Sequence, residues 1–211
     1  EHGVRGIYSE KGLCASLEEA DRIVLACRDN DVAFNWGAMR RHHDGFKRMR
    51  DSIQAGDIGE PRFAFMYSYT DLIKHHPHTL DLVSMLLGDP VPRWVEGQLV
   101  QTDSSLAGDG PQKRPRSYPL YVAENHAFLP PEDEEIADPM VDFFRVGFEG
   151  DMQGHFIPMA GMFDVEIFGT EGRAYAWDNG QVIRVRDSSH GDGDVQSKKI
   201  VPRGDSPTVS T

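Results

Sequence analysis

The alternation of apolar and polar positions first predicts a strand, a helix and a second strand. Residues 6–10 are typical of the end of a short buried strand, and residues 31–36 of the next strand. Ser16 and Glu19 form a capping box that starts the helix between them. One apolar stripe then follows the helix: Leu17, Ala20, Ile23, Val24 and Cys27. The connection is long enough for a parallel crossover, so this stretch is half of a doubly wound unit.

A helix and two strands are expected further along the chain. The helix begins with Asp44 as its cap and ends near Ala55, with Gly56 as its left-handed stop. The aromatic-rich residues 62–69 and the alternating residues 93–100 are each typical of a strand. Between these strands lies another helical pattern, which carries the most unusual chemistry of the sequence.

That pattern places three imidazoles directly in front of an apolar helix. His75, His76 and His78 fall within four positions, and Pro77 suits the first helical turn. The apolar positions that follow have helical spacing and end at a glycine: Leu80, Val83, Leu86, Leu87 and then Gly88. A helix N-terminus favours anions and lowers the pKa of a nearby imidazole, which leaves it able to accept a proton. The alternative interpretation is a polar turn that only caps a core helix.

The residue composition of the rest of the chain changes twice. Residues from about 102–138 are dense in Pro, Gly, Ser and acidic side chains, which indicates a long functional or mobile loop. Residues 141–186 then form a run of strands separated by glycine-centred turns, which predicts an antiparallel sheet. The tail after residue 188 is polar, and its segments 190–194 and 203–211 are expected to be a loop or a fraying terminus.

Composition and charge exclude some classes of binding partner. The 211 residues are 39% hydrophobic, and no apolar run approaches the roughly 18 residues of a membrane-spanning helix. A net charge of −12 would repel nucleic acid, so a small molecule is the better partner. The two cysteines, Cys14 and Cys27, have no disulfide or metal spacing, which indicates a reducing compartment. We therefore expect a cytoplasmic protein that binds neither nucleic acid nor membrane.

Several short motifs occur in an order that resembles one enzyme family. Tyr8-Ser9-Glu10-Lys11-Gly12 is similar to a strand that ends in a Glu-Lys-Pro signature, and residues 34–41 resemble the next strand and its arginine. Residues 53–59 are similar to a Gly-x-Ile-Gly turn, and residues 165–172 to a Gly-Thr-x-Gly turn. His78 to Gly88 matches a catalytic histidine at the head of a helix ending in Leu-Gly. Together they resemble the Gfo/Idh/MocA family of dinucleotide-dependent oxidoreductases.

The resemblance implies an α/β fold in two parts. Residues 1–40 would be the remnant of a Rossmann dinucleotide-binding domain. Residues 41–211 would be an α+β domain with a large, mostly antiparallel open sheet, interrupted by the insertion at about 102–138. In this family the sheet serves substrate contact and oligomerisation, which implies a homo-oligomer.

The resemblance also implies an activity. The family oxidises a secondary hydroxyl of a sugar, cyclitol or related polyol by hydride transfer to NAD or NADP. His78 would be the base and Lys11 its electrostatic partner, roles that suit an imidazole and an ammonium. The other expected site residues are Glu10, Lys11 and Arg41 for the cofactor, and Asp71, Lys74, His75 and His155 for the substrate.

The sequence differs from the family pattern in three ways, and these differences leave a second hypothesis open. No GxGxxG turn is present, so the sequence is expected to be a fragment of a longer polypeptide or not a dehydrogenase by itself. Lys74 stands where many members have an aspartate, and Gly12 replaces the proline of the signature. The alternative is a non-catalytic polyol-binding or assembly module that lacks a functional dinucleotide site. We expect no metal, because adjacent histidines rarely converge on one ion, and we interpret His42 and His43 as a solvated helix start.

Overall fold

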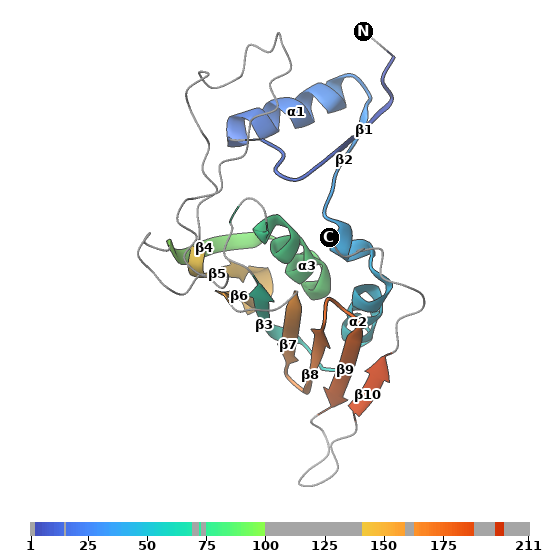
Figure 1. Ribbon diagram of the computed structural model, residues 1–211, viewed down its shortest axis with the longest axis vertical. Helices are drawn as coiled ribbons and strands as arrows, with labels where there is room; N and C mark the ends of the chain where they lie inside the picture. Colours follow the sequence, from blue (N-terminus) through green and yellow to red (C-terminus); the bar gives the residue numbers. More distant parts are fainter. Residues whose placement is uncertain are drawn as a thin grey trace.

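The computed structural model describes residues 3–14, 16–68, 72, 75–99, 141–158, 163–187 and 197–200, with only the backbone at 99, 142, 187 and 197–200. Within these residues the chain forms two sheets and three α-helices (Figure 1). The helices are α1 (Leu17–Asp29), α2 (Asp44–Gln54) and α3 (His76–Leu87), with short 3-10 helices η1 (Met39–His42) and η2 (Glu149–Asp151). The strands are β1 (Gly6–Ser9), β2 (Ala33–Trp36), β3 (Pro61–Ser68), β4 (Pro92–Leu99), β5 (Val141–Phe148), β6 (Gln153–Pro158), β7 (Asp164–Gly169), β8 (Gly172–Trp177), β9 (Val182–Asp187) and β10 (Ser197–Ile200).

The first sheet contains only β1 and β2, which run parallel and are joined by α1. The Ser16 hydroxyl accepts a hydrogen bond from the backbone N–H of Glu19, so the expected cap of α1 is confirmed. The expectation that the first strand is buried is wrong, because Ile7 is 41% and Tyr8 62% exposed. The apolar stripe of α1 is only partly covered: Cys27 is buried, but Leu17 is 86% and Val24 50% exposed. A two-stranded sheet covers too little surface to bury either element.

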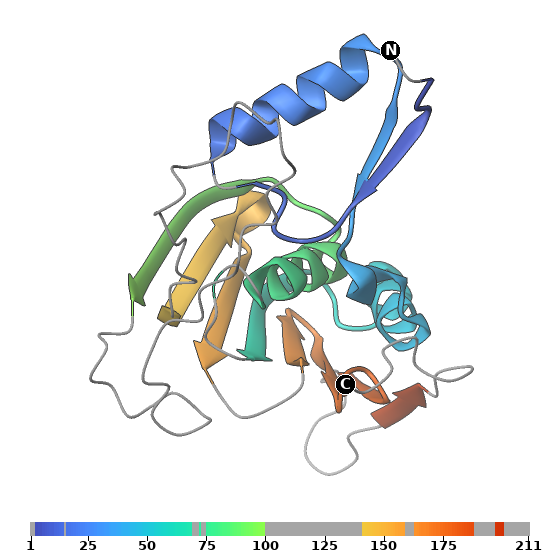
Figure 2. The same ribbon diagram turned by 45° about the horizontal axis from the view of Figure 1, so that its top comes forward.

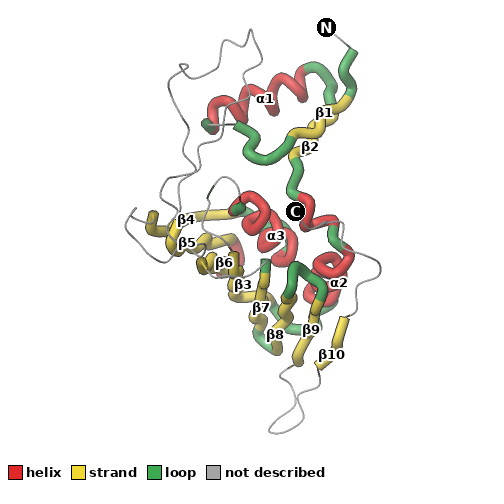
Figure 3. Tube along the Cα trace, viewed as in Figure 1, coloured by secondary structure: helices red, strands yellow, loops and turns green. Residues whose placement is uncertain are grey.

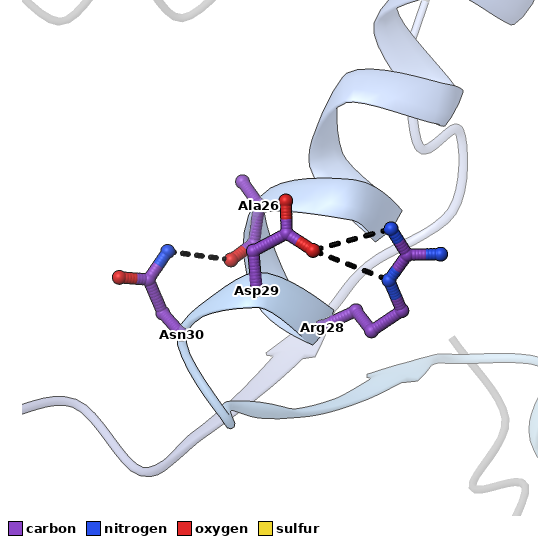
Figure 4. A network of polar contacts seen from close by, with 4 residues as sticks. All are labelled: Ala26, Arg28, Asp29 and Asn30. Carbon is purple, nitrogen blue, oxygen red and sulfur yellow. Dashed lines mark hydrogen bonds and ion pairs between the residues drawn. The ribbon is translucent and has the colours of Figure 1, made fainter.

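The end of α1 is closed by local polar contacts rather than by packing (Figure 4). The side-chain amide of Asn30 donates to the carbonyl of Ala26, and the Arg28 guanidinium donates to a carboxylate oxygen of Asp29. Asp31 then takes a left-handed conformation, with φ of 53°, and turns the chain into β2. The crossover from β1 to β2 is therefore set by residues next to one another in the sequence.

The second sheet has eight strands in the order β10-β9-β8-β7-β3-β6-β5-β4 (Figure 1). All neighbouring pairs are antiparallel except β3 and β6, which are parallel. The α/β fold with a large, mostly antiparallel sheet is thus as the sequence predicted. The sequence did not predict β10, which lies between the two polar segments expected to be loop, pairs with β9 and extends the sheet. Those two segments, 190–194 and 203–211, lie outside the described residues. The insertion at about 102–138 lies outside the described residues.

Helices α2 and α3 cover one face of this sheet, as Figures 2 and 3 show. On α3, Leu82, Val83 and Leu86 are fully buried in the main core. The predicted start and stop of α3 are confirmed, because Pro77 lies in its first turn and Gly88 ends it with φ of 91°. These features fix the position of the histidines at the head of α3.

Helix α2 begins differently from the prediction. Its cap is His43, whose Nδ1 accepts a hydrogen bond from the backbone N–H of Gly45, and not Asp44. His43 is 4% exposed, so the expected solvated helix start is wrong for His43, whereas His42 is exposed as expected. Gly45 lies so close to the carbonyl of Gly180 that any side chain there would clash with it. This contact holds the start of α2 against the turn between β8 and β9.

No helix in the described part of the chain is both long and apolar enough to cross a membrane.

Candidate active site

The first residue of the candidate site is His78, in the first turn of α3. Its side chain is 7% exposed, and its Nδ1 is buried without a hydrogen-bond partner among the described residues. The imidazole lies nearly perpendicular to the Phe163 ring, with 6.1 Å between the ring centroids and 84° between the ring planes. Tertiary packing therefore holds this imidazole in place and removes most of its contact with water.

The surroundings of His78 favour the neutral imidazole. Burial, and then the positive charges of Arg40, Lys11 and His75, lower the pKa of His78 to about 4. All the charged groups that contribute to this shift are basic, and each disfavours a second positive charge. His78 is consequently neutral at physiological pH and able to accept a proton.

Lys11 lies just after β1, at the carboxyl end of the two parallel strands. Its charge acts on His78 across a separation of 67 positions in sequence, so the two groups share one electrostatic environment. Figure 2 shows the segment that follows β1 passing above α3. The preceding residue, Glu10, is exposed, and its carboxylate accepts a hydrogen bond from the backbone N–H of Lys11. No carboxylate pairs with the Lys11 ammonium within the part of the chain that the structure describes.

The remaining residues expected near the head of α3 are only partly described. His75 precedes the first helical residue, and its side chain makes no capping hydrogen bond. Its charge is among the causes of the lowered pKa of His78, which places it close to the site. Asp71 and Lys74 lie outside the described residues, so their role in substrate binding stays a prediction.

Arg40 is a site residue that the sequence analysis missed. Its guanidinium lies over the Phe163 ring, with Cζ 3.2 Å from the ring centroid, and its Nε donates to the side-chain oxygen of Asn179 at 3.2 Å. Burial lowers the pKa of Arg40 to about 10. His78 contacts the same phenylalanine ring, so Arg40 and His78 flank Phe163 together.

Arg41, which the sequence analysis preferred as a cofactor contact, has its described contacts elsewhere. It pairs with Asp81 of α3 at 2.6 Å and with Asp89 at 3.0 Å. The hydrogen bond to Asp81 is the main cause that raises the pKa of Arg41. These pairs attach η1 to the middle of α3 and to the turn that follows its C-terminus, and this attachment also positions the neighbouring Arg40. The contact between Arg41 and the cofactor stays a prediction.

His155 lies on the other face of the sheet, and the structure does not bring it together with His78. The neighbouring Gly154 faces Val83 of α3, and successive residues of a strand point to opposite faces. The His155 imidazole stacks on Phe65, at 4.9 Å between centroids and 15° between planes. Among the described residues there is also no group of three His, Cys, Asp or Glu side chains suited to a metal ion.

The electrostatic contact between Lys11 and His78 can be measured directly. In a Lys11→Met variant the pKa of His78 is expected to rise from about 4 toward 6.5, because one of the charges that lower it is removed. An NMR titration of the His78 imidazole would measure this change. Lys47→Met in α2 is the matched control and should leave the titration unchanged. An unaltered pKa in Lys11→Met would show that the two groups do not share a site.

Comparison with known proteins gives a consistent picture of the fold. The sequence matches no protein-family model and none of the curated proteins with which it was compared. An NAD binding oxidoreductase from Klebsiella pneumoniae matches 93% of the chain with a TM-score of 0.69 at 19% identity, over 54% of its own length. The chain has the fold of NAD-binding oxidoreductases. It spans about half the length of the solved structures that it matches.

Two further structures of this fold contain ligands. An inositol dehydrogenase homologue from Azotobacter vinelandii, complexed with NADH and myo-inositol, matches 92% of the chain and 49% of its own, with a TM-score of 0.62 at 15% identity. An oxidoreductase from Agrobacterium radiobacter, in complex with NAD+, L-tartaric acid and magnesium, matches 93% of the chain and 54% of its own. Its TM-score is 0.59 at 13% identity.

Proposed function

We propose that the chain belongs to an NAD(P)-dependent dehydrogenase that oxidises a secondary hydroxyl of a sugar, cyclitol or related polyol. The observation that carries this proposal is the buried, neutral His78 at the head of α3, within electrostatic reach of Lys11. The fold and the hydroxylated ligands of its structural neighbours support it. The small-molecule partner is therefore a sugar or polyol.

His78 and Lys11 have complementary roles in such a reaction. His78 accepts the proton of the substrate hydroxyl, and Lys11 stabilises the negative charge that develops on the same oxygen. Burial of His78 keeps water from competing for the imidazole. The proton on His78 is released to solvent after the product leaves.

The cofactor would be NAD or NADP, which supplies the hydride acceptor when bound. The residues present fit its nicotinamide end, since Glu10 and Lys11 follow β1 at the carboxyl ends of two parallel strands, where α/β sheets bind ligands. Arg41 is the third residue that we assign to this end. The 211 residues contain no GxGxxG turn for the pyrophosphate.

We also propose that the protein forms a homo-oligomer through the open face of the large sheet, the face that α2 and α3 leave uncovered. Aromatic side chains project from it: Phe63, Phe65, Phe143 and Phe168, around His155. Three of the large hydrophobic side chains of this sheet, Phe63, Trp94 and Phe143, are about two-fifths exposed. Exposed apolar surface of this kind marks an interaction site. A cytoplasmic location also stays part of the proposal.

A labelled substrate tests the proposed reaction. With myo-inositol deuterated at its ring carbons, the protein is expected to transfer deuterium to the nicotinamide ring, detected by mass spectrometry of the reduced cofactor. Transfer of label requires the hydride to leave the hydroxyl-bearing carbon, so it separates this reaction from other reductions. Binding of polyols without any reduced cofactor, across a panel of sugars and cyclitols, would favour the non-catalytic binding or assembly module instead.

A further inference from the structure

The head of α3 concentrates basic groups in a chain that is acidic overall. The chain carries a net charge of −12, yet the charges that act on His78 come from Arg40, Lys11 and His75. No carboxylate contributes to the shift of the His78 pKa. The local charge at the site is therefore opposite to that of the protein.

Arg40 is a partly buried cation of this cluster, and some of its N–H donors have no partner among the described residues. One face of its guanidinium is covered by Phe163, and its Nε is bonded to Asn179. A guanidinium has five N–H donors in a planar fork, and within the described residues no carboxylate pairs with the remaining ones. A buried charge without a counterion is costly, so such a group normally has a charged partner.

Three acidic side chains of α2, of α3 and of the turn after α3 are paired with other arginines. Asp81 and Asp89 bind Arg41, and Asp44 binds Arg48 at 2.9 Å. Asp164 and Asp178, next in sequence to Phe163 and Asn179, form no ion pair with Arg40 among the described residues; an Asp164 carboxylate oxygen accepts a hydrogen bond from the backbone N–H of Asp178. Asn179, the direct partner of Arg40, is an amide and supplies no charge. The described part of the chain thus holds the Arg40 cation against a ring that His78 also contacts, and none of its carboxylates pairs with that cation.

We propose that the substrate is a polyhydroxy acid, whose carboxylate binds the free edge of Arg40 while one of its hydroxyls faces His78. This inference rests on the proposed dehydrogenase function and narrows its substrate class. The planar fork of a guanidinium matches two carboxylate oxygens, which fixes orientation as well as affinity. The carboxylate takes no part in the reaction. The secondary alcohol loses a hydride to the nicotinamide and a proton to His78, and it becomes a ketone.

Direct binding of matched ligands tests this proposal without any cofactor. Galacturonate and galactose share the same ring and hydroxyls, except that galacturonate carries a carboxylate in place of the terminal CH2OH group. Calorimetry on the protein is expected to show galacturonate binding at least about tenfold more tightly than galactose, as a charge-assisted pair provides. Equal affinities, or no binding of either ligand, would overturn the proposal.

Substitutions assign the preference to Arg40. Arg40→Gln is expected to bring the affinity ratio of acid to neutral sugar close to one, while Arg48→Gln in α2 should keep it. Asn179→Asp is a second variant that leaves Arg40 in place and supplies it with a carboxylate. It should also abolish the preference, and Asn179 already has a positive φ of 54°, which aspartate tolerates. A thermal melt shows whether each variant folds.

The remaining outcomes separate this proposal from its alternatives. If Arg40→Gln weakens NAD(P)H binding and leaves the preference for galacturonate intact, Arg40 binds a cofactor phosphate and the proposal is wrong. If Arg40→Gln lowers the melting temperature but keeps the preference, its role is only structural and the proposal again fails. Arg40-dependent acid binding without any hydride transfer would contradict the dehydrogenase function and leave the carboxylate site standing.

Discussion

A His78→Ala variant is expected to lose nearly all polyol-dependent reduction of NAD(P) while it still binds NAD(P)H. The imidazole is the only neutral base among the described side chains that we place at the substrate hydroxyl, and general base catalysis contributes about 10²- to 10⁴-fold. Alanine removes it without adding a group that could replace it. Steady-state kcat and a separate cofactor titration by fluorescence would distinguish lost chemistry from lost binding.

The control and the pH profile make this prediction specific. His42 is exposed at the end of η1, and His42→Ala should leave kcat unchanged. Because the pKa of His78 is lowered to about 4, the imidazole stays neutral when the pH falls from 7 to about 5, and kcat/KM should remain flat over that range. Activity should then fall as His78 becomes protonated. Comparable turnover in His78→Ala and the unsubstituted protein would rule out the base role.

The position of His78 could be predicted because the signals for α3 are local. Pro77 favours a first turn, Gly88 accepts a positive φ, and the apolar spacing between them selects the buried face. The capping box at Ser16 is local in the same way. Each of these features depends on residues within a few positions of one another, so it can be predicted without knowledge of tertiary contacts.

Arg40 could not be chosen from the sequence, because its neighbour Arg41 has the same chemistry. In η1 the two side chains point in different directions: Arg41 reaches the carboxylates of Asp81 and Asp89, and Arg40 reaches Phe163 and Asn179. These partners are 40 to 139 positions away. Only the turn between β8 and β9, held against α2, brings Asn179 to Arg40. Tertiary contacts of this kind leave no periodic signal.

The face of the sheet on which His155 lies could not be predicted from the sequence either. Alternation along β6 shows that His155 and Gly154 point to opposite faces, but not which face α3 covers. The apolar residues of this sheet occur on both faces, since the open face is also aromatic. Likewise, the parallel pairing of β3 with β6 joins strands far apart in the chain. Sequence patterns identify the strands well, but they do not show which strands lie next to one another in a sheet.

The aromatic open face supports the second large expected effect, which is the dissociation of the oligomer by Phe63→Glu. Phe63 on β3 is 42% exposed, and the centroid of its ring lies 6.2 Å from the centroid of the His155 imidazole. If two copies pair through this face, the substitution places a carboxylate in the apolar centre of the interface. Central aromatic residues of interfaces contribute about 2 kcal/mol or more, so we expect the dissociation constant to rise at least about 30-fold. Sedimentation velocity over a range of concentrations would measure it.

A matched substitution elsewhere separates loss of the interface from a general effect of added charge. Leu17 is 86% exposed at the start of α1, away from the large sheet, and Leu17→Glu should leave association unchanged. Phe143 on β5 is 39% exposed, and its ring also lies beside His155. Phe143→Glu should therefore weaken association as Phe63→Glu does. Unchanged sedimentation of both folded variants would show that the aromatic face does not hold the copies together.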